Sequence, residues 1–297
     1  TDDRVQPGLL ENGPVYRDGW FAMPVVRAGK VYIFGGGHVS RALVPVIAAA
    51  EFRPVVYDDR PEFVTPEAFP QAEGLLCGPF TELSRSVTVT PEDYVVIMTR
   101  GHQADYEVLS QVLRSGAKYL GCIGSRRKLA LCKERLLAAG FTEAEYARLH
   151  APIGLAIGAQ TAAEIALSIL AQIVQVKNAR PQTEGYPIAL LDAMVQAENA
   201  RTPAVLATIV ARHGSTPRDV GAKMLVLPDG STVGSVGGGI MEHYTVQAAR
   251  KMLAQAAPAL QCLQLSADGK NEDAAIAACG GSMEVLLQTL CPGEEAK

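Results

Sequence analysis

A glycine-rich run directly after a short apolar segment constrains this chain more than any other feature. Residues 31–34 read Val-Tyr-Ile-Phe, and Gly35, Gly36 and Gly37 follow them before Ser40 opens a stretch with apolar residues at helical spacing. The pattern predicts a buried strand, a tight turn and a helix. Gly35 and Gly37 stand at the glycine positions of a dinucleotide-binding fingerprint, with Ser40 at the third small position. Without Cβ atoms, the backbone there could approach a phosphate at the helix N-terminus.

A second apolar segment, residues 54–57, ends at Asp58, about twenty residues beyond the glycines, where such fingerprints place a ribose-binding carboxylate. This context favours a nucleotide-type site. An ordinary strand–helix turn remains the alternative for the glycines. The run Asp58-Asp59-Arg60-Pro61 is also a good turn sequence, so Asp58 has a structural alternative as well.

The composition describes a globular protein with room for two hydrophobic cores. Of 297 residues, 48% are hydrophobic and 20% are charged, and the net charge of −4 argues against general nucleic-acid binding. No apolar run reaches the length of a membrane span. The six cysteines contain no C-x-x-C pair, which favours reduced thiols and a cytoplasmic location. Isolated histidines and scattered cysteines offer no metal site.

The alternation of patterns along the chain predicts two domains. Residues 1–29 are rich in Gly, Pro and acidic groups and indicate a loosely structured lead-in. Residues 30–180 alternate strand and helix patterns, which predicts an α/β fold with a doubly wound, mostly parallel, Rossmann-like sheet. Residues 186–293 predict a smaller α+β domain with antiparallel strands, including a hairpin at Asp229-Gly230.

Two further loops of the first domain follow predicted strand ends, where open α/β sheets bind ligands. One contains Arg100 and His102; the histidine could act as an acid or base, or simply bond to the backbone. The other is Gly124-Ser125-Arg126-Arg127-Lys128, in which Ser125 could cap a helix. Cations oppose the helix dipole at that end, so they favour an anion site over a solvated basic turn.

The second domain has its own glycine loop and a distinctive cysteine. Gly237, Gly238 and Gly239 precede a helix that carries Glu242, an arrangement that suits either a bound anion or plain turn geometry. Cys279 stands directly before two glycines. Open backbone amides there could favour a reactive thiolate, although a buried, inert cysteine is the alternative.

At this point the chain resembles the xanthine dehydrogenase accessory family, XdhC/CoxI. The first domain is similar to the Rossmann module of that family and the second to its CoxI module, although the CoxI module usually comes first. The stretches that carry the resemblance are residues 33–40, 58–60, 99–102, 123–128 and 150–154 in the first domain, and residues 207–210, 214–218, 221–224, 237–242 and 279–281 in the second.

The resemblance implies a maturation factor for a molybdenum hydroxylase of the xanthine dehydrogenase type. Such a factor binds the molybdenum cofactor (molybdopterin), protects it during sulfuration and helps to insert it into the apoenzyme. It implies a cofactor-handling chaperone rather than an enzyme, a homodimer, and a cysteine desulfurase as a further partner. Two alternatives remain: an NAD(P)-dependent oxidoreductase, and a nucleotide-binding redox sensor without catalysis.

The resemblance and the residue patterns together define the candidate site residues. Cys279 and His102 are the candidates for chemistry, with Cys279 expected near the molybdenum or its sulfur. The residues expected to hold the cofactor are Gly35, Gly36, Gly37, His38, Ser40, Asp58, Arg100, Gly124, Ser125, Arg126, Arg127, Ser215, Arg218, Lys223, Gly237, Gly238, Gly239 and Glu242.

Overall fold

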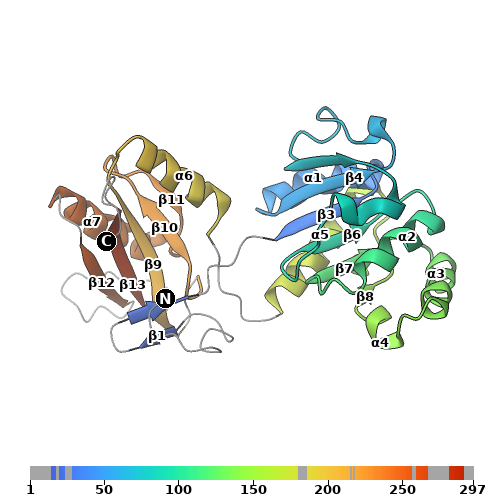
Figure 1. Cartoon of the computed structure of the whole chain (residues 1–297). Coiled ribbons are helices and arrows are strands. Elements are labelled where there is room, and N and C mark those ends of the chain that lie inside the picture. The colour runs from blue at the N-terminus through green and yellow to red at the C-terminus, as the bar shows by residue number, and fades with distance from the viewer. Residues whose placement is uncertain are drawn as a thin grey trace. The chain divides into compact units, whose positions relative to one another are not determined.

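The computed structural model describes residues 15–17, 20–23, 29–179, 186–214, 216, 218–255, 259–266 and 281–290. The chain divides into two units, each with its own sheet (Figure 1). The parallel-sheet unit is Ala28–Arg180. The antiparallel-sheet unit combines Thr1–Arg27 with Pro181–Lys297.

The sheet of the parallel-sheet unit has six strands in the order β5-β4-β3-β6-β7-β8, and all neighbouring strands run parallel. This is the doubly wound order of a Rossmann sheet, so the predicted fold class is confirmed. Because strand order reverses between β3 and β6, a crevice for ligands is expected at their carboxyl ends. The strands are β3 (Lys30–Phe34), β4 (Arg53–Asp58), β5 (Gly74–Cys77), β6 (Tyr94–Ile97), β7 (Tyr119–Cys122) and β8 (Leu149–His150).

Helices cover both faces of this sheet, as the continuous apolar strands require. Along β3, Val31 and Ile33 join the core under α1 (His38–Ala49) and α5 (Ala162–Asn178). Tyr32 and Phe34 point the other way, into the core under α2 (His102–Val112) and α3 (Arg126–Ala138). The shorter helices are η1 (Pro61–Phe63), η2 (Phe80–Arg85) and α4 (Glu143–Tyr146).

Helices α3 and α5 have caps that follow local sequence signals, and the cap expected at Ser125 is confirmed. Thr161 and Glu164 form a complete capping box at the start of α5. Ser125 Oγ accepts a hydrogen bond from the Lys128 amide at 3.4 Å and so caps α3. Gly140, with φ +87°, follows the end of that helix in the left-handed region that favours glycine.

The antiparallel-sheet unit has a five-stranded sheet in the order β11-β10-β9-β13-β12, with all pairs antiparallel. Helix α6 (Ile188–Asn199) packs against Leu206 of β9, and α7 (Gly239–Ala254) packs against Val205 and Ala207 on the other face. The predicted α+β class is therefore confirmed. The strands are β9 (Ala204–His213), β10 (Lys223–Val226), β11 (Thr232–Gly234), β12 (Leu260–Ser266) and β13 (Ser282–Leu290).

Two hairpins of this unit can be compared with the sequence. The hairpin predicted at Asp229-Gly230 joins β10 to β11, with Gly230 at φ +87°. No strand is expected from the sequence before Val31, yet β1 (Val15–Arg17) pairs antiparallel with β2 (Trp20–Ala22). Aromatic and β-branched residues within these two short segments favour strands even inside a polar, glycine-containing stretch.

Candidate functional site

The glycine turn after β3 is shaped by close packing of backbone against backbone. Gly35 has φ +111°, and a Cβ there would lie 2.3 Å from the Met98 carbonyl oxygen. A Cβ on Gly36 would lie 2.1 Å from the Phe63 carbonyl oxygen. Both positions therefore require glycine for the fold itself, whether or not a ligand binds.

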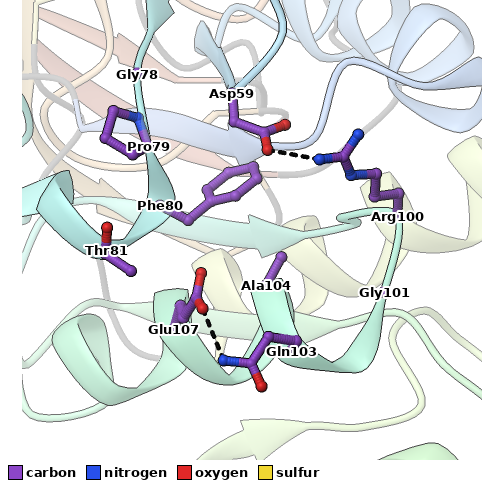
Figure 2. A pocket seen from close by; sticks show the side chains of 10 residues that line it. All are labelled: Asp59, Gly78, Pro79, Phe80, Thr81, Arg100, Gly101, Gln103, Ala104 and Glu107. Carbon is purple, nitrogen blue, oxygen red and sulfur yellow. Dashed lines mark hydrogen bonds and ion pairs between the residues drawn. The ribbon is translucent and has the colours of Figure 1, made fainter.

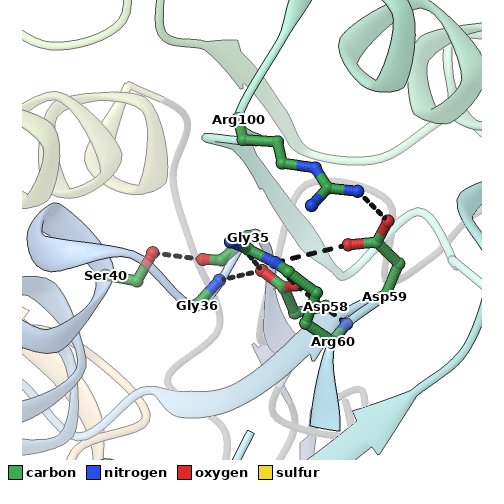
Figure 3. Close-up of polar contacts among 7 residues, drawn as sticks. All are labelled: Gly35, Gly36, Ser40, Asp58, Asp59, Arg60 and Arg100. Atoms are coloured by element: carbon green, nitrogen blue, oxygen red, sulfur yellow. Dashed lines mark hydrogen bonds and ion pairs between the residues drawn. The ribbon is translucent and has the colours of Figure 1, made fainter. Parts of the chain in front are cut away.

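Asp58, at the carboxyl end of β4, holds this turn in place (Figure 3). Its buried carboxylate accepts a hydrogen bond of 2.8 Å from the Gly36 amide. Arg60 forms a bidentate ion pair with the same carboxylate: its Nε lies 2.9 Å from Asp58 Oδ1 and its Nη2 lies 3.1 Å from Asp58 Oδ2. Burial alone would raise the pKa of Asp58, but the Arg60 guanidinium and the amides of Gly36 and Arg60 hold that pKa below its usual value. The carboxylate predicted to bind ribose is thus engaged with the protein.

Gly37 differs from its two neighbours because its surroundings are open. It is the N-cap residue of α1 at φ −75°, and a Cβ there would meet nothing within 4 Å. No side chain caps α1, and its first turn contains no acidic residue. Ser40 is buried and donates its hydroxyl to the Gly35 carbonyl, while His38 is exposed. The first turn of α1 therefore presents amides and the positive end of the helix dipole without a protein carboxylate.

A pocket of about 550 Å³ lies at the carboxyl end of the same sheet (Figure 2). Its walls come from the segments that follow β4, β5 and β6 and from the first turns of α2. Across its mouth, Arg100 Nη2 donates to Asp59 Oδ2 at 2.9 Å. The lining residues are Asp59, Gly78, Pro79, Phe80, Thr81, Arg100, Gly101, Gln103, Ala104 and Glu107.

The buried carboxylate of Asp105 holds the loop that carries Arg100 in place through a hydrogen bond. Thr99 Oγ1 donates to Asp105 Oδ1 at 2.5 Å, and Asp105 is only 8% exposed. Burial raises the pKa of Asp105, and hydrogen bonds from Thr99 offset part of that rise. His102 starts α2 and is exposed. The predicted histidine therefore lies near the pocket loop but does not line the pocket.

The basic cluster that follows β7 lies at the start of α3. Ser125 serves as the cap, and Arg126, Arg127 and Lys128 are all exposed. A Cβ on Gly124 would lie 3.2 Å from Leu129 Cγ, so this glycine allows the helix to pack closely on its loop. None of these residues lines the pocket.

In the antiparallel-sheet unit, the second glycine loop is filled by the chain's own carboxylate. Glu242 Oε2 accepts hydrogen bonds from the Gly238 amide at 3.0 Å and from Ser235 Oγ at 2.7 Å. Gly237, Gly238 and Gly239 all have positive φ, at +122°, +71° and +58°. An anion entering this loop would have to displace Glu242.

The remaining predicted residues of this unit divide between described and undescribed positions. Lys223 is buried in β10, donates to the Gly221 carbonyl at 2.6 Å and lies 4.6 Å from the centroid of the Tyr186 ring. Arg218 is exposed and has an interaction partner. Ser215 and Cys279 lie outside the described residues.

Four cysteines belong to the described residues, and they differ in accessibility. Cys122 and Cys132 are buried, whereas Cys77 and Cys262 are exposed. Burial, reinforced by the nearby Asp105 carboxylate, raises the pKa of Cys132 to about 11. No group of three or more His, Cys, Asp or Glu side chains in the described part of the chain is arranged to hold a metal. Nor does any helix described there have the length and apolar character needed to cross a bilayer.

Several pocket residues were not among the predicted site residues. Asp59 immediately follows Asp58, and the fingerprint spacing selects Asp58 instead of Asp59. Phe80 follows β5, and a strand of four residues is too short a signal in the sequence to mark the loop after it as part of a ligand site. Gln103 and Glu107 are four residues apart on α2, and this spacing places them on one helical face beside the predicted Arg100 loop.

Comparison with protein families accounts for both units. Residues 31–173 match the model of the XdhC Rossmann domain, and residues 197–264 match that of the XdhC and CoxI family. The chain belongs to the XdhC/CoxI family. Its order, with the Rossmann module before the CoxI module, is the one inferred from the sequence.

Two curated relatives of this XdhC/CoxI chain are similar over about half of its length. An uncharacterized Escherichia coli protein, YqeB, is 38% identical over 51% of the chain. A Bacillus subtilis protein, described as a probable xanthine dehydrogenase subunit, is 28% identical over 50% of the chain. The matches cover only 28% and 43% of those relatives. Family and relatives together link the chain to xanthine dehydrogenase accessory proteins.

A solved structure from Bacillus halodurans, described as a xanthine dehydrogenase, is also similar. It is 31% identical, covers 56% of this chain and 46% of its own, and superposes with a TM-score of 0.48.

Proposed function

We propose that this chain is an accessory factor that binds the molybdenum cofactor and prepares it for a molybdenum hydroxylase of the xanthine dehydrogenase type. The observation that carries the proposal is the start of α1. It has open space at Gly37, no capping side chain and no acidic residue in its first turn. Such an N-terminus suits the phosphate of a molybdopterin or of its dinucleotide form.

The residues present fit the charge and size of that group. Gly37 leaves the backbone accessible, and Arg100 has an exposed guanidinium at the neighbouring pocket. Arg126 adds a cation at another strand end of the same sheet. When bound, the cofactor supplies a dithiolene-held molybdenum centre; the chain's own residues bind its phosphate and shield it from water.

The proposal includes partners and a location that follow from family membership rather than from contacts. The receiving partner would be the apoenzyme of the hydroxylase, with a cysteine desulfurase as the sulfur source. The accessory factor would act as a homodimer in the cytoplasm. Cys279 is proposed as the thiol near the molybdenum or its sulfur. In this role the chain is a chaperone and not a catalyst.

An NAD(P)-dependent oxidoreductase is the competing function. It is supported by the Rossmann strand order with a glycine turn after β3. Its weakness is the lack of a hydride-transfer acid or base in the described pocket lining other than carboxylates. A nucleotide-binding redox sensor would need the same pocket but no such group.

Calorimetry separates these functions. Molybdenum cofactor released from a purified molybdoenzyme, NADH and NADPH are each titrated into the protein under anaerobic conditions. Saturable binding of the cofactor supports the accessory role, and the same protein purified from a molybdenum-replete host should contain pterin. Saturable NADH binding without cofactor binding would establish the oxidoreductase or sensor instead.

A further inference from the structure

The pocket of the parallel-sheet unit contains a carboxylate, that of Glu107, which keeps hydrogen-bond acceptor capacity for a ligand. Glu107, on α2, lines the pocket, and its Oε1 accepts a 2.7 Å hydrogen bond from Gln103 Nε2 (Figure 2). Among the described residues, no cation pairs with Glu107 and nothing bonds to its Oε2. Gln103, by contrast, is bonded at both ends of its amide, because its own oxygen accepts from Arg135 Nη1 at 2.5 Å.

The rest of the pocket has an apolar wall, and the Arg100–Asp59 ion pair lies across its mouth. Phe80 is 4% exposed and packs on Tyr57 with ring centroids 5.6 Å apart, and Ala104 adds a small apolar surface. Arg100 stands at the mouth, with its side chain 60% exposed. The pocket thus combines a small apolar surface with several converging polar groups, and polar groups of this kind fix the orientation of a bound ligand.

A carboxylate selects among heterocycles by the donors that they present. It is an acceptor-only group, and each of its oxygens can accept more than one hydrogen bond. Guanine and the pterin ring both carry a ring N–H next to an exocyclic NH₂, on the edge known as 2-amino-4-oxo. In cytosine and adenine the exocyclic NH₂ lies beside a ring-nitrogen acceptor instead of a ring N–H, and that acceptor would face a carboxylate oxygen unfavourably.

We propose that Glu107 binds the 2-amino-4-oxo edge shared by the pterin of the cofactor and the guanine of a guanine dinucleotide. This assignment rests on the proposed function, and it names the end of the ligand that the pocket takes. Charge-assisted hydrogen bonds from two adjacent donors give the carboxylate its selectivity. A base without that pair leaves the carboxylate desolvated and incompletely bonded.

The test uses the full-length chain and four small probes: pterin, GMP, CMP and AMP. Calorimetry or quenching of pterin fluorescence gives each Kd for the native protein, for Glu107→Gln, and for Glu134→Gln as a charge-matched control on exposed α3. Glutamine keeps the size and the helix propensity of glutamate, so the fold is expected to persist. The Glu107 variant should weaken pterin or GMP binding by about tenfold to a hundredfold, with CMP and AMP nearly unchanged.

The outcomes separate the two ligand sources and the two hypotheses. Preference for pterin would place the pterin end in this pocket, whereas preference for GMP would place the guanine end there. Equal binding of all four probes, no binding of pterin or GMP, or a Glu107→Gln protein with native affinities would overturn the assignment. If released cofactor binds native and variant protein equally, only this inference fails. If it binds neither, the proposed function itself fails.

Discussion

Substitution of two nearby glycines should separate the structural part of the glycine turn from its ligand-binding part. Gly37→Val is expected to leave the fold nearly intact, because φ is −75° and a Cβ has open space around it. Loss of a good N-cap residue costs about 1 kcal/mol. For a domain of this size, that lowers the melting temperature by about 2–4 °C.

Gly35→Ala is the matched contrast in the same turn. Its φ of +111° disfavours any side chain, at a cost of about 1–3 kcal/mol. The Met98 carbonyl oxygen, 2.3 Å from the new Cβ, follows the central strand β6 and cannot move without disturbing the sheet, which adds a cost of similar size. Together these terms amount to about 4 kcal/mol, so melting should fall by roughly 8–16 °C.

The effect on cofactor affinity should be larger in Gly37→Val than in Gly35→Ala, the opposite of the effect on melting temperature. In Gly37→Val the valine methyl groups occupy the space in front of the α1 amides, so the affinity for released molybdenum cofactor should fall at least about tenfold. Thermal unfolding and anaerobic calorimetry on both variants measure the two effects independently. A folded Gly37→Val protein with native affinity would refute a phosphate site at α1. A Gly35→Ala protein with native melting temperature would refute the packing argument.

Three further expectations concern charge and thiols. Asp58→Asn should cost about 2 kcal/mol at neutral pH. Because the folded pKa of Asp58 is lowered, its contribution is present above the ordinary carboxyl pKa and fades as pH falls, so native and variant melting curves should converge in acid. Arg126→Ala should weaken cofactor binding more at low salt than at high salt, and a salt-independent loss would indicate packing. Cys279 should alkylate faster than Cys291 and be protected by cofactor; equal rates without protection would make it structural.

The sequence predicted those features that arise from neighbouring residues. Apolar runs, glycine positions and the capping residue Ser125 are local signals, and they led correctly to the parallel sheet, the turn and the capped helix α3. The pocket was not predictable in this way. Its walls come from segments after three different strands, and the spatial order of those strands is needed before Phe80 and Glu107 can be assigned to one pocket.

Asp58 shows that correct spacing does not by itself identify a side chain that is free to bind a ligand. The aspartate stands at the end of β4, where a nucleotide-binding carboxylate is expected. Two residues later, Arg60 folds back and occupies both oxygens, and the Gly36 amide uses one of them as well. At the ends of β4 and β6, the charged groups that line the pocket are those of the neighbouring Asp59 and of Arg100.

The two glycine loops lead to a general criterion for open anion sites. Both precede a helix, and from their glycines alone they predict the same function. Glu242, in the first turn of α7, reaches back and bonds to the Gly238 amide, whereas α1 has no acid in its first turn. A carboxylate of the chain thus already occupies one loop, and an external anion there must compete with a tethered one at high effective concentration. In the turn before α1, Asp58 takes the Gly36 amide, but among the described residues no side chain caps the first turn of α1 itself. A phosphate should therefore bind at Gly37 first.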